Sequence, residues 1–283
     1  MDLGLKNKIA IVTGSGEVLG KKIAQTLAEE GAKVVINDIF PEKVKRTVAE
    51  FQKMGLAATG ITADVTVFEK VKAMMEKVAK EQGRIDILVN NVGVPWGTLG
   101  PKSRGWFAEQ EPTEWDEILR HNIVCTMNCS RAALPFMIKQ NYGKIINISS
   151  IGTIASVVKT CAYQSGKGAV NAFTQSLAGE VGKYGINVNT VLPGFSYGAR
   201  DTLVDKRRDE HPEEYKQRLI HRDRMISLTP LGRMATGDDY ANAVAFLASE
   251  KASFVTGAIL RVDGGFPQVL DYQSGALPEQ GHE

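Results

Sequence analysis

The sequence predicts an α/β protein with a doubly wound parallel sheet of about seven strands. Three observations lead to this fold class. Short apolar runs alternate with longer helical patterns along most of the chain. The apolar runs are continuous in Val and Ile, which is typical of strands that are covered on both faces, as in parallel sheets. A glycine-rich stretch joins the first run to the first helix, and alternation of this kind indicates βαβ units.

The strands are expected in the short apolar runs, at residues 8–13, 33–37, 56–63, 85–89, 144–148, 187–192 and 258–262. The helical patterns between them carry boundary signals. Gly31 and Gly83 end two helices, and Pro41 begins another. The expected helices span residues 18–30, 41–54, 67–82, 114–140, 163–184 and 241–249.

Length and composition fit a single domain over residues 1–283. A chain of 283 residues is near the upper size for one hydrophobic core. Its 34 Lys and Arg residues nearly balance 32 Asp and Glu residues, so no charge surplus indicates a nucleic acid or an acidic membrane as partner. The chain shows no signal peptide and no apolar run of about 18 residues, the length of a membrane span. A cytoplasmic location is therefore expected.

Three segments interrupt the regular alternation of strands and helices. Residues 94–112 and 195–225 are long connections, and residues 270–283 form a polar tail. Long connections in a compact domain usually serve function. The cysteines, by contrast, give no site: Cys125, Cys129 and Cys161 are too few for a disulfide framework, and too few further ligands lie nearby for a metal.

The junction after the first strand predicts a loop that binds a dinucleotide. Residues 13–20 read Thr-Gly-Ser-Gly-Glu-Val-Leu-Gly. Glycines there allow a tight turn and a close approach to a pyrophosphate, while the helix N-terminus offers free N–H groups. A structural turn is the competing interpretation. The position between the first strand and the first helix favours the nucleotide.

Asp38 ends the second strand, 24 residues after Gly14. A carboxylate at this place accepts hydrogen bonds from the adenosine ribose and repels a 2′-phosphate. Glu17 in the loop is also acidic, and no Arg or Lys follows Asp38 directly. The predicted cofactor is therefore NAD rather than NADP. Taken alone, Asp38 is also explained as the cap of the helix that begins at Pro41.

Further motifs follow in order along the chain: Asn90-Asn91-Val92-Gly93, Ser150, Tyr163-Gln164-Ser165-Gly166-Lys167 and Pro193-Gly194. Together with the glycine-rich loop they resemble the short-chain dehydrogenase/reductase family over residues 5–268. The resemblance implies a three-layer Rossmann-type fold and an NAD(P)-dependent alcohol dehydrogenase or ketoreductase acting on a secondary alcohol or ketone. It also implies a homodimer or homotetramer formed through helices 114–140 and 163–184.

Tyr163 and Lys167 are four residues apart, so both project from one face of a helix. A tyrosine with a pKa near 10 is a poor base at neutral pH, but a nearby ammonium lowers that pKa. Tyr163 is therefore the expected general acid and base. The resemblance implies that Ser150 donates a hydrogen bond to the substrate oxygen and that Lys167 holds the nicotinamide ribose. It places a water for proton relay at Asn122.

Each of these residues alone is more simply explained by packing, capping or solvation, and their joint occurrence favours catalysis. By position, the resemblance assigns cofactor contacts to Gly14, Ser15, Val18, Leu19, Asp38, Asp64, Val65, Asn91, Gly93, Tyr163, Lys167 and Ser196. Val18 departs from the family pattern, which has a glycine there, because a β-branched residue does not readily adopt a positive φ. We expect a loop path altered through Gly16 and a weaker hold on the cofactor.

The two long connections bear on the substrate. The first holds Trp96, Trp106 and Phe107, and the second holds Arg200, Lys206, Arg207, Arg208, His211, Lys216, Arg218, His221, Arg222 and Arg224. In the family both would border the substrate cleft. One hypothesis is an alicyclic or aromatic alcohol, carried as an acyl-CoA thioester whose anionic part meets the basic residues. Seven acids share the second segment, so a helical lid with a solvated face explains it equally well.

Two other function classes stay open. One is a catalytically silent NAD-binding subunit of a hetero-oligomer, which Val18 favours and the intact Ser150, Tyr163 and Lys167 oppose. The other is an epimerase or dehydratase that uses transient oxidation on the same fold. Such relatives usually have a longer C-terminal substrate domain than the residues after Val262 provide.

Overall fold

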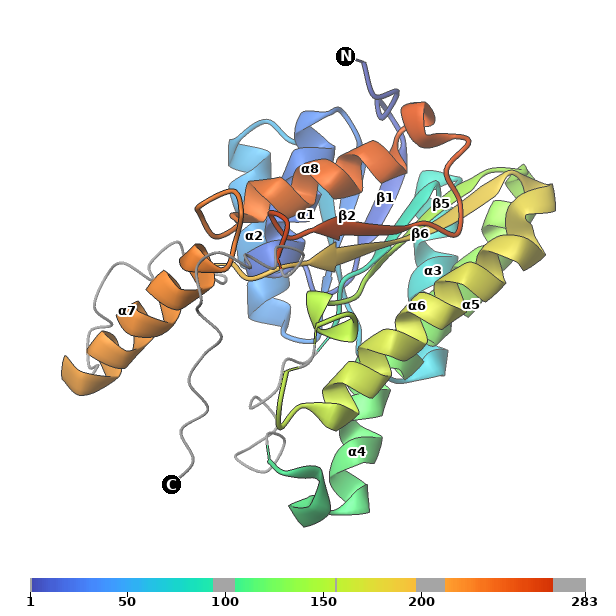
Figure 1. Ribbon diagram of the computed structural model, residues 1–283. Coiled ribbons are helices and arrows are strands. Elements are labelled where there is room, and N and C mark those ends of the chain that lie inside the picture. The colour runs from blue at the N-terminus through green and yellow to red at the C-terminus, as the bar shows by residue number, and fades with distance from the viewer. Residues whose placement is uncertain (1, 94–104, 156, 197–211, 267–283) are drawn as a thin grey trace.

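The computed structural model of the chain describes residues 2–93, 105–155, 157–196 and 212–266. Within these ranges one seven-stranded sheet has the order β3-β2-β1-β4-β5-β6-β7. Every neighbouring pair is parallel, and helices cover both faces (Figure 1). The predicted doubly wound fold is therefore confirmed. The strands are β1 (Ile9–Val12), β2 (Lys33–Asp38), β3 (Ala58–Thr62), β4 (Ile87–Asn90), β5 (Gly143–Ile148), β6 (Ile186–Pro193) and β7 (Ile259–Val262).

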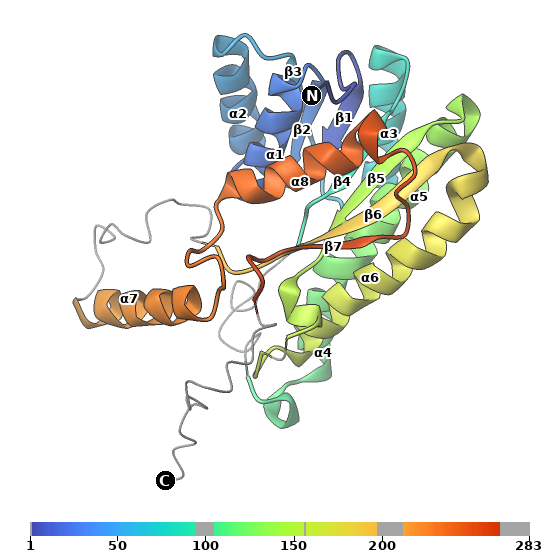
Figure 2. The same ribbon diagram turned by 45° about the horizontal axis from the view of Figure 1, so that its top comes forward.

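The helices form a layer on each face of the sheet. One layer contains α1 (Val18–Glu29), α2 (Pro41–Lys53) and α8 (Gly237–Ala248). The other contains α3 (Phe68–Gln82), α5 (Cys125–Gln140) and α6 (Cys161–Val181). Two further helices, α4 (Pro112–Leu119) and α7 (Pro212–Ser227), extend beyond the sheet (Figure 2).

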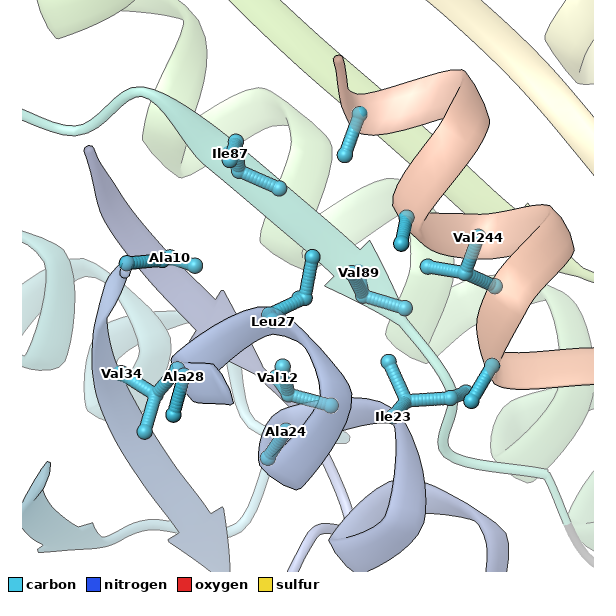
Figure 3. Close-up of a cluster of buried hydrophobic side chains, with 14 of the residues drawn as sticks. Ala10, Val12, Ile23, Ala24, Leu27, Ala28, Val34, Ile87, Val89 and Val244 are labelled. Carbon is cyan, nitrogen blue, oxygen red and sulfur yellow. The ribbon is translucent and has the colours of Figure 1, made fainter. Parts of the chain in front are cut away.

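Both faces of β1 are buried, which explains its unbroken apolar sequence. Ala10 and Val12 belong to the core cluster of the α1 layer, whereas Ile9 and Ile11 belong to the cluster of the α3 layer. Each aliphatic side chain buried in this way contributes about 1.5–3 kcal/mol. Figure 3 shows part of the first cluster, with Val12, Ile23, Leu27, Val89 and Val244.

One helical expectation was wrong, and one helix lies where a long connection was expected with a charged helix as the alternative. The segment 114–140, expected as one regular helix, contains a five-residue π-helical turn at Arg120–Val124 between α4 and α5. Such turns are rare and often occur at functional sites. Helix α7 lies in the segment that was expected to be a long connection. Its sequence is charged and lacks a clear apolar stripe, so the periodicity gave no signal for it.

No helix in the described ranges is long and apolar enough to cross a membrane. The thiols of Cys125 and Cys129 are buried one helical turn apart in α5, and Cys161 is exposed at the start of α6. Burial raises the pKa of both buried thiols, so they are neutral packing groups.

Candidate active site

A cavity of about 1490 Å³ opens where the strands end. Its lining includes residues that directly follow β1, β2, β3, β4, β5 and β6. In open α/β sheets this edge is where ligands bind. The volume exceeds the range of about 300–1000 Å³ that is usual for a drug-sized ligand, so it can hold a dinucleotide together with a second molecule.

The loop between β1 and α1 has the form that a bound pyrophosphate requires. Gly14 has a φ of 60°. A Cβ atom added at Gly16 would lie 2.7 Å from the Asp38 Oδ2 atom, and one added at Gly20 would collide with the Gly14 carbonyl oxygen. These glycines let the loop pack closely against Asp38 and against its own turn, and Gly14, Val18, Leu19 and Gly20 at the start of α1 line the cavity, where a helix N-terminus offers free amides. The residues present therefore fit a dinucleotide.

Val18, the first residue of α1, itself adopts the left-handed conformation, with a φ of 62°. The expectation that Gly16 would redirect the loop was wrong, because Val18 keeps the conformation that a glycine would take there. Left-handed backbone costs a residue with a Cβ about 1–2 kcal/mol. The Val18 side chain is 45% exposed and lines the cavity, so little burial offsets this cost.

We expect Val18→Gly to tighten NADH binding several-fold and to leave the melting temperature unchanged or slightly higher. Binding should tighten because the Val18 side chain lines the cavity beside the loop and is removed. Stability should hold because relief of left-handed strain is opposed by only about 0.5–1 kcal/mol of glycine entropy. Fluorescence titration and thermal unfolding measure the two effects. Val67→Gly is the matched control, since Val67 caps α3 with a φ of −107° and is similarly exposed; it should only destabilise. Weaker NADH binding by Val18→Gly would contradict the account.

At the end of β2, Asp38 lines the cavity and accepts hydrogen bonds from the Gly16 amide at 3.2 Å and the Phe40 amide at 3.1 Å. The structure brings two cations here that the spacing along the sequence had not indicated. Lys43 and Arg46, both on α2, pair with Glu17 at 2.5 and 3.5 Å. The hydrogen bond from Lys43 is the main reason that the pKa of Glu17 is lowered.

Most of the expected cofactor contacts line the cavity: Gly14, Val18, Leu19, Asp38, Asp64, Val65, Asn91, Gly93, Tyr163, Lys167 and Ser196. Ser15 does not. Its side chain is fully buried and donates to the Val12 carbonyl at 2.7 Å, so it fixes the loop to β1. The Asn91 side chain also holds the loop, because its Nδ2 atom donates to the Thr13 carbonyl at 2.9 Å.

Ser150, Tyr163 and Lys167 meet on the cavity wall as the spacing predicted. Ser150 was expected to end a strand, but β5 ends at Ile148, and Ser150 caps a short 3₁₀ turn by accepting a bond from the Gly152 amide. Tyr163 and Lys167 lie on the first turns of α6 and are 8% and 3% exposed. Water therefore has little access to either functional group.

The electrostatics of this group differ from the expectation that Lys167 lowers the pKa of Tyr163. Burial raises the pKa of Tyr163, and the group that lowers it is the hydroxyl of Ser150, through a hydrogen bond. Burial also lowers the pKa of Lys167, to about 8. The Lys167 Nζ atom donates to the carbonyl of Ile148, the last residue of β5, at 2.9 Å.

Asn122 lies within the π-helical turn, fully buried beneath the cavity, and its Nδ2 atom donates to the Ile118 carbonyl at 2.8 Å. The surroundings of Gly93 show that Asn122 lies close to Lys167. A Cβ atom added at Gly93 would lie 2.5 Å from the Lys167 Nζ atom and 3.1 Å from the Asn122 Oδ1 atom. The π-helical turn thus brings the amide of Asn122 to the buried end of Lys167.

Sequence reasoning missed Tyr240. This buried residue of α8 lines the cavity, and its hydroxyl donates to the Gly194 carbonyl at 2.9 Å. Burial raises its pKa, against a hydrogen bond with Ser196. Tyr240 thus fixes the loop after β6. Its place in an amphipathic helix resembled that of an ordinary core residue, so the sequence carried no signal.

The aromatic side chains expected at the substrate cleft lie elsewhere where the structure describes them. Phe107 stacks on Trp115, with ring centroids 4.9 Å apart, and the Lys159 ammonium lies 4.8 Å from the centre of the Trp106 ring. Neither Trp106 nor Phe107 lines the cavity formed by the described residues. Trp96 lies outside those residues.

Several known proteins are similar to this chain in sequence or structure. The family model for enoyl-(acyl carrier protein) reductase matches residues 14–267. The BbsD subunit of (2S)-[(R)-hydroxy(phenyl)methyl]succinyl-CoA dehydrogenase from Thauera aromatica is 36% identical, covering 93% of this chain and 98% of that protein. The 3-oxoacyl-[acyl-carrier-protein] reductase FabG of Staphylococcus aureus is 35% identical, covering 91% and 97%. A gluconate 5-dehydrogenase from Burkholderia cenocepacia, in complex with NADP and tartrate, superposes with a TM-score of 0.82 at 32% identity, covering 95% and 98%.

Proposed function

Because this chain belongs to the short-chain dehydrogenase/reductase family of oxidoreductases, we propose that it transfers a hydride between NAD and a secondary alcohol or ketone. The observation that carries the proposal is that Ser150, Tyr163 and Lys167 share the wall of a cavity whose glycine loop fits a dinucleotide. When bound, the nicotinamide supplies the acceptor or donor of the hydride.

Tyr163 moves the proton in this proposal. Burial keeps its phenol protonated at neutral pH, so the chain is prepared to reduce a ketone: the hydroxyl gives its proton to the carbonyl oxygen as the carbonyl carbon is reduced. Ser150 donates a second hydrogen bond to the same oxygen and stabilises the charge that develops there. In the oxidative direction Tyr163 takes the alcohol proton, which requires positive charge nearby.

Lys167 supplies that charge and binds the ribose hydroxyls of the cofactor. Its pKa of about 8 leaves it mostly protonated at neutral pH. To bind the ribose, the Lys167 ammonium either gives up its hydrogen bond to the Ile148 carbonyl or keeps it and donates its other two protons to the ribose hydroxyls. Asn122, next to Lys167, supports the water through which the proton reaches solvent.

The proposed preference for NAD rests on the charges at the adenosine end. The Asp38 carboxylate lines the cavity and would repel a 2′-phosphate, and Glu17 pairs with the two nearby cations, Lys43 and Arg46. A related structure at 32% identity is a complex with NADP, so a direct measurement of cofactor choice is the test.

We expect the purified protein to bind NADH more tightly than NADPH, and Asp38→Asn to reduce this preference at least tenfold. The amide keeps an acceptor for the Gly16 and Phe40 amides but removes the repulsive charge. Parallel fluorescence titrations with both cofactors measure the change. Glu42→Gln, on the first turn of α2 and outside the cavity, is the control. Equal or tighter binding of NADPH by the unaltered protein would contradict the preference.

For the substrate we propose a cyclic or aryl secondary alcohol, or its ketone, carried as an acyl-CoA thioester. One relative named above is a dehydrogenase subunit for a phenyl-bearing succinyl-CoA compound, which supports this class. A panel of such ketones, offered as free compounds and as thioesters with NADH, tests it. We also propose a homodimer or homotetramer through α5 and α6, since Val124, the residue just before α5, and Met127 on its first turn are exposed.

A second candidate is a catalytically silent NAD-binding subunit. Val18 favours it, since its side chain lines the cavity at the phosphate loop, where a glycine would leave more room for the cofactor. The panel distinguishes the two: binding of NADH without turnover of any ketone would place this candidate first.

A further inference from the structure

One wall of the cavity is formed by α7. Arg218, His221 and Arg222 line it, and their spacing of three and four residues places them on one face of the helix. The Arg218 guanidinium lies 5.2 Å from the centre of the Tyr215 ring. Arg222 pairs at 2.6 Å with Asp223, whose own side chain is mostly exposed. Arg224 and Lys216 are exposed and do not line the cavity.

The C-terminal end of α7 is fixed to the body of the protein. Met225 is buried, and the Thr229 hydroxyl donates to its carbonyl at 2.8 Å. The Leu231 amide then donates to the Gly264 carbonyl at 3.2 Å. The basic face is therefore held toward the cavity, although α7 lies outside both helix layers (Figure 2).

The carboxylates that line the described part of the cavity are bound away from α7. They are Glu17 with Lys43, Asp38 with the Gly16 amide, Asp64 with Thr66, and Asp238 with Lys22. On α7 itself Asp223 pairs with Arg222, so this one carboxylate against Arg218 and Arg222 leaves a net positive charge beside the cavity. The pyrophosphate of a dinucleotide already has the glycine loop and the N-terminus of α1, so an anionic group that meets the α7 face would belong to a second molecule.

We propose that Arg218, His221 and Arg222 bind an anionic group of the substrate, a phosphate or a carboxylate, while the substrate carbonyl meets Tyr163. This recognition serves the hydride transfer proposed above and depends on it. Arginine presents a planar fork of donors that fits phosphate and carboxylate oxygens, and the imidazole adds a donor. The phosphates of a coenzyme A thioester and the carboxylate of an oxo acid share this chemistry.

The test compares three ketones with the same acyl group: acetoacetyl-CoA, acetoacetate, and the uncharged S-acetoacetyl-N-acetylcysteamine. Each is reduced with NADH by the wild-type protein and by the variant Arg218→Ala/Arg222→Ala. We expect kcat/KM of the variant to fall about 10- to 100-fold for at least one anionic ketone, through KM, because charge-assisted hydrogen bonds are lost. The uncharged ketone should change less than twofold. A fall with acetoacetyl-CoA alone identifies phosphate, and a fall with acetoacetate identifies carboxylate.

Arg224→Ala is the control, because it removes an arginine from the same helix outside the cavity, one positive charge where the double variant removes two. It should leave all three ketones unchanged. Three results would overturn the proposal: an equal fall for charged and uncharged ketones, a selective weakening of NADH binding, or no change at all. The second would mean that α7 binds the cofactor phosphates.

A binding measurement separates this proposal from the proposed reaction. Calorimetric titration of coenzyme A and of acetoacetate into the NADH-loaded protein should show binding of at least one that the double variant weakens at least tenfold and Arg224→Ala does not. If no ketone is reduced but this difference persists, the reaction fails and the anion site stands. If ketones are reduced but binding of both anions is the same in wild type and double variant, the anion site fails and the reaction stands.

Discussion

Replacing Tyr163 with phenylalanine is expected to lower kcat for ketone reduction by about a thousandfold while NADH binding changes less than twofold. The phenol is the proposed proton donor, and a positioned acid contributes about 10²–10⁴-fold. The ring keeps its packing with Ile118 and Ala162, so the fold should persist. Steady-state kinetics and an NADH fluorescence titration measure the two effects.

Tyr184→Phe provides the control for this variant, because Tyr184 lies at the far end of the same helical segment and outside the cavity. It should retain wild-type kcat. If Tyr163→Phe kept more than about a tenth of the activity, another group would have to supply the proton, and the role given to Tyr163 would be wrong.

Replacing Lys167 with methionine should abolish activity and also change how stability depends on pH. Burial lowers the pKa of Lys167 from 10.5 to about 8, so the folded protein holds this proton less tightly than the unfolded chain. Between pH 8 and 10.5 the unfolded state binds the extra proton, and wild-type stability therefore gains about 3 kcal/mol from this group as pH rises. Below pH 8 the buried charge imposes its full penalty on the folded state.

The measurement is the free energy of unfolding of wild type and Lys167→Met at pH 7, 8, 9 and 10. Taking the difference between the two proteins cancels every other titrating group. The advantage of Lys167→Met should be largest at pH 7 and should shrink as the pH rises through 8. A difference that stays constant over this range would mean that burial does not lower the pKa of Lys167.

Much of the fold follows from pattern alone. The strand β1 is apolar on both faces because two helix layers cover it, and this is why a continuous run such as Ile9 to Val12 predicts a parallel strand. The approach of Tyr163 and Lys167 follows from helical spacing. Their meeting with Ser150 follows from the rule that loops at the carboxyl ends of parallel strands share one edge.

Other features depend on contacts between segments far apart in the sequence. Glu17, in the loop before α1, pairs with Lys43 and Arg46 on α2. The spacing of these residues along the sequence does not reveal the contact. Tyr240 reaches Gly194 across 46 residues. Helix α7 was expected only as an alternative to a long connection, because its charged sequence has no clear apolar period to fix its bounds, although the same charges give it its proposed role.

Two features of the backbone conformation also differ from what the sequence predicts. A π-helical turn around Asn122 interrupts what reads as one long helix, because no residue type marks such a turn in sequence. Val18 shows the opposite case: its type argues against a positive φ, yet the surrounding loop imposes one. Both deviations lie at the cavity, where departures from local preference are expected to serve function.

The central claim is that this chain transfers a hydride from NADH to a ketone with Tyr163 as acid. The most direct test uses NADH carrying deuterium at one face of C4 and the ketone panel, with mass spectrometry of the product alcohol. The account predicts one deuterium on the carbinol carbon from one face of NADH only, transferred about a thousandfold more slowly by Tyr163→Phe. Tight NADH binding with no deuterium transferred to any ketone would contradict it and favour the silent subunit.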